Sequence, residues 1–246
     1  MLRGYSFASQ WRSNEAYKAA TPEPNPLADY FRAHKTGPGI WKWEHYFDIY
    51  HRHFARFRHR EVHVLEIGIY SGGSLNMWQQ YFGTECRIYG VDIEPACRTY
   101  ESDAVRVFIG DQQDRAFWQA FKKEVPRVDI VMDDGGHQVE QQIATLEELL
   151  PHLQPGGVFL CEDLYGAYNR FASYVGGLAL QLNTADVTSA DPDSFERRSV
   201  VKPSAFQSAI HSVHCYPFVT VIEKHEESTS EFVAPKHGTE WQPFLR

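Results

Sequence analysis

Residues 62–74 read Val-His-Val-Leu-Glu-Ile-Gly-Ile-Tyr-Ser-Gly-Gly-Ser, or VHVLEIGIYSGGS in one-letter code. The apolar run at 62–68 predicts a short buried strand that ends in Glu66 and Gly68. A glycine-rich turn follows, and we expect Ser74 to cap a helix that continues to about Gln80. A strand that passes through such a turn into a helix is typical of the first half of a β-α-β unit.

The same alternation continues along the chain. Further strands are predicted at 87–93, 105–110, 128–132 and 158–161, with helices at 116–124 and 139–153 between them. Strands that alternate with helices predict parallel pairing in a doubly wound α/β fold. Two more strands, at 209–215 and 218–224, are joined by so short a turn that they must be antiparallel neighbours. We therefore predict a Rossmann-like, seven-stranded sheet that is mostly parallel and ends in an antiparallel hairpin.

The chain is expected to divide into three regions, of which the middle one contains the predicted sheet. Residues 1–60 are expected to form a helical N-terminal extension or lid, residues 61–224 the main domain, and residues 225–246 a polar tail. Aromatic residues in 41–59 recur every three or four positions, which predicts an amphipathic helix. Its Trp43, His45 and Tyr46 either close over a ligand or belong to a plain core helix. Another helix is predicted at 171–183, and residues 184–207 are expected to be irregular.

Composition excludes several classes of protein. The net charge of −8 argues against general nucleic-acid binding, which depends on neutralising phosphates. The stretch 51–60 is basic and interleaved with aromatic residues; we interpret it as a solvated helix face, with an RNA-binding stripe as the alternative.

No apolar run is long enough to span a bilayer and no secretory signal is recognisable, so we expect a cytoplasmic protein without a membrane partner. The four scattered cysteines indicate reduced thiols.

The ends of the first four strands carry residues suited to a nucleotide-like ligand. Ligands of an open parallel sheet bind outside the carboxyl ends of its strands. There the glycine at 68 lets the backbone approach a ligand, Asp92 can accept both hydroxyls of a ribose, and Asp111 can accept from an exocyclic amine. The pyrophosphate motif G-x-G-x-x-G is missing, and Glu66 would repel a pyrophosphate but suit a sulfonium or ammonium group. The predicted cofactor-binding residues are Glu66, Gly68, Ser74, Asp92, Asp111, Gln112 and Asp133.

A family resemblance is carried by five segments: VLEIGIYSGGSLNMW, IYGVDI, FIGDQQDRAFW, DIVMDDGGH and LQPGGVFLCEDL. Together they resemble the class I S-adenosylmethionine-dependent methyltransferases over about residues 41–224. Within that superfamily the chain looks most like the metal-dependent sugar O-methyltransferases of antibiotic biosynthesis, of the mycinamicin and macrocin type, and their rhamnosyl relatives. The resemblance implies S-adenosylmethionine as methyl donor and a sugar hydroxyl of a glycosylated natural product as acceptor.

A second cluster of charge lies at the ends of the fourth and fifth strands. Asp134, Glu162 and Asp163 would crowd at one edge, and a divalent cation such as Mg²⁺ would relieve their repulsion. In the family that the chain resembles, the metal ligands are an Asp in D-x-x-H and a downstream acidic pair, which here match Asp134, Glu162 and Asp163. His137 then matches the general base that takes the proton of the acceptor hydroxyl.

Purely structural roles are the alternatives to the metal-binding and base roles of these residues. The pair at 133–134 is also compatible with a solvated strand end, the pair at 162–163 with a helix cap, and His137 with a hydrogen-bonding residue beside the cofactor. We interpret His211 and His214 as ordinary sheet residues, one of which could face the acceptor. Two tyrosines, at 165 and 168, are expected to line an acceptor pocket.

The predicted partners are a small glycosylated acceptor and further copies of the same chain. One alternative acceptor is a phenol, catechol or amine, with or without metal. A cofactor-binding protein without turnover is another alternative, and a nicotinamide-dependent dehydrogenase is the most distant.

Overall fold

The computed structural model describes residues 2–11, 24–166, 170–184, 198–235 and 237–238 of the 246-residue chain. A seven-stranded sheet forms its centre, with the strand order β3-β2-β1-β4-β5-β8-β7. Its strands are β1 (Val62–Ile67), β2 (Cys86–Asp92), β3 (Val105–Ile109), β4 (Ile130–Asp133), β5 (Val158–Cys161), β7 (Ile210–Tyr216) and β8 (Val219–Lys224). The first five are parallel, and β8 pairs antiparallel with both β5 and β7. The predicted fold, including its terminal hairpin, is confirmed.

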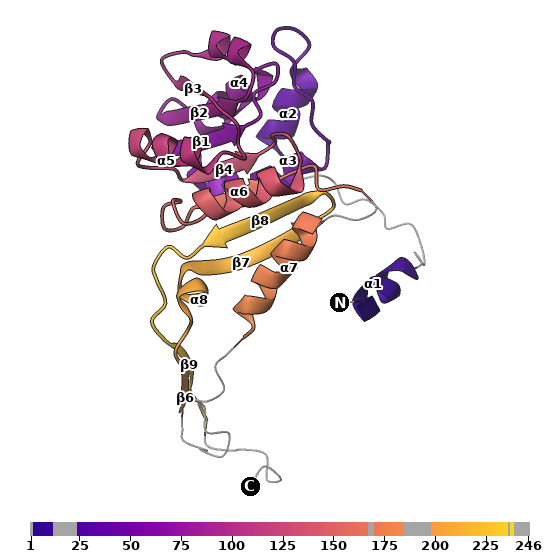
Figure 1. The fold of residues 1–246 in the computed structure, drawn as a ribbon, viewed down its shortest axis with the longest axis vertical. Coiled ribbons are helices and arrows are strands. Elements are labelled where there is room, and N and C mark those ends of the chain that lie inside the picture. The colour runs from indigo at the N-terminus through magenta and orange to yellow at the C-terminus, as the bar shows by residue number, and fades with distance from the viewer. Residues whose placement is uncertain (1, 12–23, 167–169, 185–197, 236, 239–246) are drawn as a thin grey trace.

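Helices cover both faces of this sheet (Figure 1). One layer comprises α2 (Pro26–Ala33), α3 (Tyr46–Phe54), the 3-10 turn η1 (Ala55–Phe57) and α4 (Gly73–Phe82). The opposite layer comprises α5 (Arg115–Glu124), α6 (Val139–Leu149) and α7 (Arg170–Leu182). A further 3-10 segment, η2 (Pro95–Tyr100), follows β2. Helices α2 and α5 begin where the side chains of Asn25 and Asp114 accept backbone N–H groups.

The side chains of β1 show why the sheet is buried on both faces. Val62 and Val64 belong to the core beneath α2, α3 and α4, whereas Leu65 and Ile67 belong to the core beneath α5, α6 and α7. Successive side chains of a strand point to opposite faces, so an apolar run can fill both cores only if each face is covered. This explains why apolar residues of the strand occupy positions on both faces instead of alternating strictly with polar residues.

The register of β4 and β5 positions the acidic residues. Asp133 is paired with Cys161, so the residues that follow them, Asp134 and Glu162, leave the sheet side by side at its carboxyl edge. The expectation that the two acidic segments share one edge is thereby confirmed.

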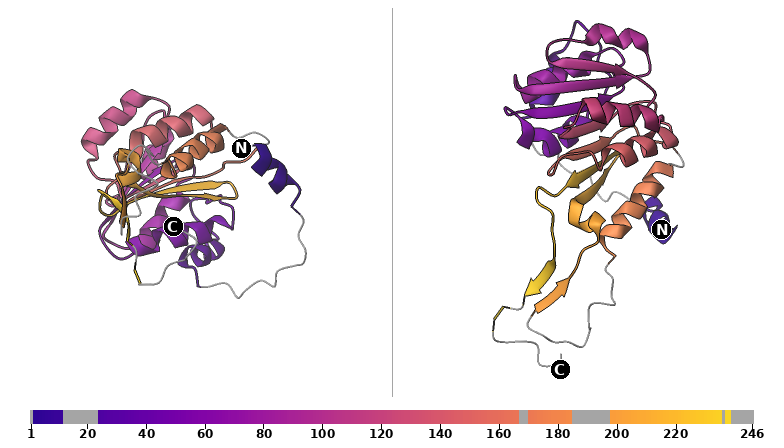
Figure 2. Two further views of the ribbon diagram at one scale, coloured as in Figure 1. Left: turned by 90° about the horizontal axis from the view of Figure 1, so that it is seen from below. Right: turned by 60° about the vertical axis from the view of Figure 1, so that its left-hand side comes forward.

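Several details differ from the expectations. Helix α4 begins at Gly73 with Gly72 as its N-cap, in the left-handed conformation at φ 75°, so Ser74 is not the cap. A left-handed cap suits glycine, and the Ser74 hydroxyl instead donates to Glu66. The segment 184–207 is not irregular throughout, because its residues Arg198–Val201 form β6, which pairs antiparallel with β9 (Phe232–Pro235) of the polar tail in a second, two-stranded sheet. That sheet extends away from the main body, beyond α8 (Ala205–Ala209) (Figure 2).

The remaining element, α1 (Leu2–Ser9), lies near the N-terminus. Among the described residues no helix combines the length and the apolar character needed to cross a membrane. All four cysteines are free thiols, of which Cys86, Cys97 and Cys161 are buried and Cys215 is exposed.

Candidate functional site

A cavity of about 910 Å³ opens at the carboxyl edge of the sheet. Parallel strands bring their ends together there, so residues from β1 to β5 meet around one space. Eight of the predicted site residues line it: Gly68, Asp92, Asp111, Gln112, Asp134, His137, Glu162 and Asp163. The other three, Glu66, Ser74 and Asp133, are buried and are not part of the lining.

The turn after β1 forms one wall of the cavity. Gly68 has φ +89°, and a Cβ atom there would collide with the carbonyl oxygen of Asp134, so the two strand ends can approach only because residue 68 is glycine. Oδ2 of Asp92 accepts hydrogen bonds from the backbone N–H groups of Ile69 at 2.8 Å and Tyr70 at 3.1 Å. Asp92 therefore fixes the shape of this turn while it borders the cavity.

Glu66 lies beneath this wall. Its carboxylate is fully buried and accepts from Ser74 Oγ at 2.9 Å and Trp78 Nε1 at 3.1 Å. Burial raises the pKa of Glu66 to about 7, although its hydrogen bonds and the nearby Lys42 ammonium oppose the rise. Glu66 does not line the cavity, so it affects the cavity only through the residues that it contacts, namely Ser74, Trp78 and Lys42.

Asp133 and Gln112 form a second buried pair. Gln112 Nε2 donates to Asp133 Oδ1 at 3.0 Å, and Gln112 Oε1 accepts from the N–H of Gly136 at 2.7 Å. Among the described residues, Oδ2 of Asp133 is a buried oxygen without a hydrogen-bond partner. Burial raises the pKa of Asp133 to about 6. An unsatisfied buried acceptor is costly, so this oxygen is a place where a ligand donor would be favourable.

Lys42 was not predicted as a site residue, yet it lies at the centre of the acidic cluster. Its ammonium nitrogen is 2.5 Å from Asp134 Oδ2, 2.6 Å from Glu162 Oε1 and 4.0 Å from Glu66 Oε1. Burial alone lowers the pKa of Lys42, but the three carboxylates outweigh it and keep the ammonium charged. One positive charge thus faces three acids, and the cluster retains an excess of acidic groups.

The two adjacent acids at the end of β5 have different surroundings. Glu162 points inward, where it binds Lys42 and accepts from Tyr50 Oη at 2.7 Å; burial and the neighbouring Asp134 raise its pKa to about 8. Asp163 takes a left-handed backbone conformation at φ +59° and accepts from Tyr46 Oη at 2.7 Å. The change in backbone hand turns the second carboxylate towards the cavity.

A group of three potential metal ligands lies on the cavity wall. One ligand atom each from Asp134, His137 and Asp163 falls within 4.8 Å of the others, and His137 Nε2 is 3.6 Å from Asp163 Oδ2. His137 also has a positive φ of 56°, a strained conformation that is common at functional sites. Two carboxylates and an imidazole fit a divalent cation by their chemistry, with hard oxygen donors suited to Mg²⁺. Asp134 and Glu162 both contact Lys42, but the structure brings only Asp134 of these two into the group with His137 and Asp163.

Aromatic side chains surround the mouth of the cavity. Phe218 lies 5.6 Å from Trp43 and 5.9 Å from Tyr165, measured between ring centroids, and the latter two residues also line the cavity. His45 joins the group through its ring contact with Phe218 and a hydrogen bond between its Nε2 and the carbonyl oxygen of Pro217 at 3.1 Å. Tyr165 was expected to line an acceptor pocket, and it does line the cavity. Residue 168 lies outside the described residues.

The contacts with the acidic cluster that the sequence did not predict are made by Lys42, Tyr46 and Tyr50. Tyr46 and Tyr50 are one helical turn apart, so both hydroxyls can reach the acidic pair from the same face of α3. A lysine flanked by Trp41 and Trp43 in an otherwise aromatic segment was the available signal. Such a lysine needs acceptor or acidic partners from elsewhere in the chain once its ammonium group is buried.

Residues 65–164 match the family described as "Methyltransferase domain". Among curated proteins, the chain is 32% identical over 235 residues to the 8-demethyl-8-(2-methoxy-alpha-L-rhamnosyl)-tetracenomycin-C 3'-O-methyltransferase of Streptomyces olivaceus, covering 89% of this chain and 59% of that one. It is 37% identical to the demethylmacrocin O-methyltransferase of Streptomyces fradiae, covering 61% of this chain and 38% of that one. It is 34% identical to the mycinamicin VI 2''-O-methyltransferase of Micromonospora griseorubida, covering 60% and 37%. The chain therefore spans roughly two fifths to three fifths of the length of these relatives.

The same likeness appears among solved structures. MycE, a methyltransferase from the mycinamycin biosynthetic pathway solved in complex with Mg and SAH, superposes with a TM-score of 0.64 at 27% identity, covering 83% of this chain and 55% of that one. A second MycE structure, which also contains mycinamycin VI, gives a TM-score of 0.63.

Proposed function

Because residues 65–164 match a methyltransferase domain and the chain is similar to sugar O-methyltransferases of antibiotic pathways, we propose that it is an S-adenosylmethionine-dependent methyltransferase that transfers a methyl group to a sugar hydroxyl of a glycosylated natural product with the help of a divalent cation. One observation carries the proposal. The strand ends predicted to hold the cofactor and the group Asp134, His137 and Asp163 line the same cavity.

The donor and the acceptor would meet between these two walls. S-adenosylmethionine supplies a methyl group on a positively charged sulfur, and Gly68, Asp92, Asp111 and Gln112 line the part of the cavity predicted to bind it. The aromatic rim around Trp43 borders the same opening and suits the apolar faces of a bulky glycoside. Holding donor and acceptor in line would supply much of the rate enhancement.

His137 is proposed to remove the proton from the acceptor hydroxyl. It lies on the cavity wall beside Asp163, with about a third of its side chain exposed. A bound divalent cation would lower the pKa of that hydroxyl and fix its position. Asp134 and Asp163 are the residues placed to hold the cation, and Glu162 stays a predicted ligand whose carboxylate contacts Lys42.

The test measures transfer of a radioactive methyl group from S-adenosylmethionine to demethylated macrolide and rhamnosyl-polyketide glycosides. We expect turnover to stop in EDTA and to return with Mg²⁺, and the Asp134→Ala variant to lose turnover while it still binds S-adenosylmethionine. Glu140→Gln is the matched control, because Glu140 is an exposed acid on α6 whose partner is Arg170. Full activity of Asp134→Ala in EDTA would refute the metal assignment.

A second panel of acceptors separates the main proposal from its alternative. The relatives above are named for a rhamnosyl tetracenomycin, demethylmacrocin and mycinamicin VI as acceptors, and the rhamnosyl group in the first name favours glycosides. Turnover of catechols, phenols or amines in EDTA, with no turnover of glycosides, would instead establish a metal-independent methyltransferase for another small acceptor.

A further inference from the structure

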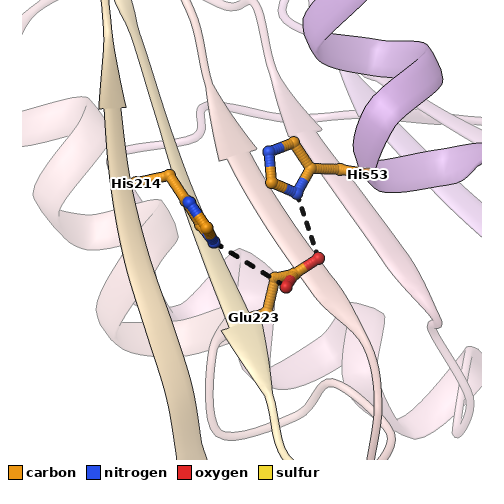
Figure 3. A group of neighbouring side chains, drawn as sticks. All are labelled: His53, His214 and Glu223. Atoms are coloured by element: carbon orange, nitrogen blue, oxygen red, sulfur yellow. Dashed lines mark hydrogen bonds and ion pairs between the residues drawn. The ribbon is translucent and has the colours of Figure 1, made fainter.

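A second cluster of metal-binding side chains lies apart from the cavity. It comprises His53 on α3, His214 on β7 and Glu223 on β8, and one ligand atom of each falls within 4.8 Å of the others (Figure 3). None of the three lines the cavity described above. Three elements far apart in sequence thus direct two imidazoles and a carboxylate at one point.

The hydrogen bonds of the cluster orient the atoms that a metal would bind. His53 Nδ1 is 3.0 Å from Glu223 Oε1, and its other ring nitrogen, Nε2, is 2.9 Å from Tyr216 Oη. A partner on the far nitrogen of a histidine is the usual arrangement at metal sites, because it fixes the ring and directs the near nitrogen to the ion. His214 Nε2 lies 3.8 Å from Glu223 Oε2 and 2.9 Å from the hydroxyl of Ser212.

The protonation states also suit metal binding. The hydrogen bond from His53 and the charge of Arg56 lower the pKa of Glu223 to about 2, so the carboxylate is ionised at neutral pH. An ion on His53 Nδ1 would take the place of the Nδ1 proton and of its hydrogen bond to Glu223. Burial lowers the pKa of His214, which favours its neutral form and a free lone pair. The cations around the cluster oppose an ion: Arg56 donates to Glu223 Oε1 at 3.0 Å, and Arg52 also lowers the pKa of His214. Arg56 and His53 both contact Oε1, whereas Oε2 accepts a long hydrogen bond from Ser212 Oγ at 3.4 Å, so Oε2 is the less engaged oxygen and the one assigned to coordination.

Burial differs across the cluster in a way that provides an entry side. Only 4% of the His53 side chain and 13% of the Glu223 side chain are exposed, against 37% of the His214 side chain. An ion could enter past His214, and a water molecule could complete a tetrahedron on that side.

We propose that His53 Nδ1, His214 Nε2 and Glu223 Oε2 bind a divalent transition-metal ion, best Zn²⁺, that fastens α3 to the β7-β8 hairpin. Two imidazoles and one carboxylate favour Zn²⁺ over Mg²⁺, which prefers oxygen ligands only. The site is separate from the cavity and serves stability rather than methyl transfer.

Zinc titration of the EDTA-treated protein tests the proposal. We compare the unaltered chain with His214→Gln and with His211→Gln, a matched control on the same strand, whose ring lies outside the cluster. We expect His214→Gln to lose one equivalent of Zn²⁺ and His211→Gln to keep it. In Asp134→Asn, which weakens the group in the cavity, the equivalent that depends on His214 should remain. Equal zinc binding by His214→Gln and the unaltered chain would overturn the proposal.

Two further measurements do not depend on that variant. Tyr216→Phe removes the partner of His53 Nε2, and we expect zinc affinity to fall about 10–100-fold, the range for outer-shell partners. In the unaltered chain, Co²⁺ should give the intense visible absorption of a four-coordinate site; a purely six-coordinate spectrum would refute the assignment. Zn²⁺ should also raise the melting temperature of the unaltered chain and of His211→Gln, but not that of His214→Gln. Methyl transfer with Mg²⁺ should be the same in all three.

Discussion

Replacing Glu66 by Gln should stabilise the protein at alkaline pH and leave it nearly unchanged in acid. The side chain is fully buried, and burial raises its pKa from 4.5 to about 7. In the unfolded chain the same carboxyl group ionises at its ordinary pKa. As the pH rises, the unfolded chain therefore loses this proton first, and each such ionisation favours unfolding.

The expected magnitude follows from that difference. The stability contributed by the protonated carboxyl is fully present below about pH 4.5 and is lost as the pH rises through 7. At 1.36 kcal/mol for each tenfold change, the loss at pH 8 amounts to about 3 kcal/mol. The amide of Gln carries no charge, yet it keeps an oxygen for the indole N–H of Trp78 and can donate to the hydroxyl of Ser74. Glu66→Gln should thus gain about 3 kcal/mol at pH 8 relative to the unaltered chain, or about 6–12 °C in melting temperature.

Urea unfolding at pH 5 and pH 8 checks this result. Glu140→Gln serves as the control because Glu140 is exposed, so its replacement should have a small effect at both pH values. The reasoning is refuted if Glu66→Gln changes stability equally at the two pH values, or if it destabilises the protein at pH 8. Binding of S-adenosylmethionine, measured on the same samples, shows whether the buried acid is retained for function at a cost in stability.

Three further predictions concern the cavity. Lys42→Met should lower the free energy of unfolding by about 3–5 kcal/mol, because it leaves the buried Glu162 and Asp134 without their cation, and Lys42→Arg should lower it less. Thermal unfolding of both variants checks this, and equal melting temperatures for Lys42→Met and the unaltered chain would contradict it. Gly68→Ala should cost about 1–3 kcal/mol and weaken cofactor binding, because the new methyl group meets the carbonyl oxygen of residue 134; calorimetry measures both, and unchanged values would show that the turn relaxes freely. His137→Gln should reduce the rate at saturating donor by about 10²–10⁴-fold with donor affinity preserved; a rate within twofold of normal across the pH range would remove the base role.

The fold was predictable because its signal is local and repeated. Each of the five parallel strands is a mainly apolar segment of four to seven residues that is followed by a turn and then a helical segment, and the strands were placed to within two residues at each end. The carboxyl edge then follows from parallel pairing alone, which is why Asp134 and Glu162 were expected beside each other.

The features that the sequence did not predict depend on contacts between distant residues, on left-handed backbone conformation or on very short strands. Lys42 is 92 residues from Asp134 and 120 from Glu162, so no local pattern announces their pairing. The different roles of Glu162 and Asp163 arise from the left-handed backbone at 163, a conformation that aspartate tolerates better than most residues but adopts too rarely for the sequence to predict it. Strands β6 and β9 were missed because each is four residues long and lies in a polar segment, where alternation is too short to detect.

The insertion of β8 between β5 and β7 has a consequence for how the chain is made on the ribosome. When residues up to about 161 have emerged, β5 is the outermost strand of the growing sheet, and its partner β8 begins 58 residues later at Val219. Until that partner is synthesised, the backbone N–H and C=O groups along one side of β5 face outward beside wholly apolar side chains. Nascent chains of this length should be the ones most prone to stick to one another or to recruit chaperones, and release from that state should coincide with the emergence of the hairpin.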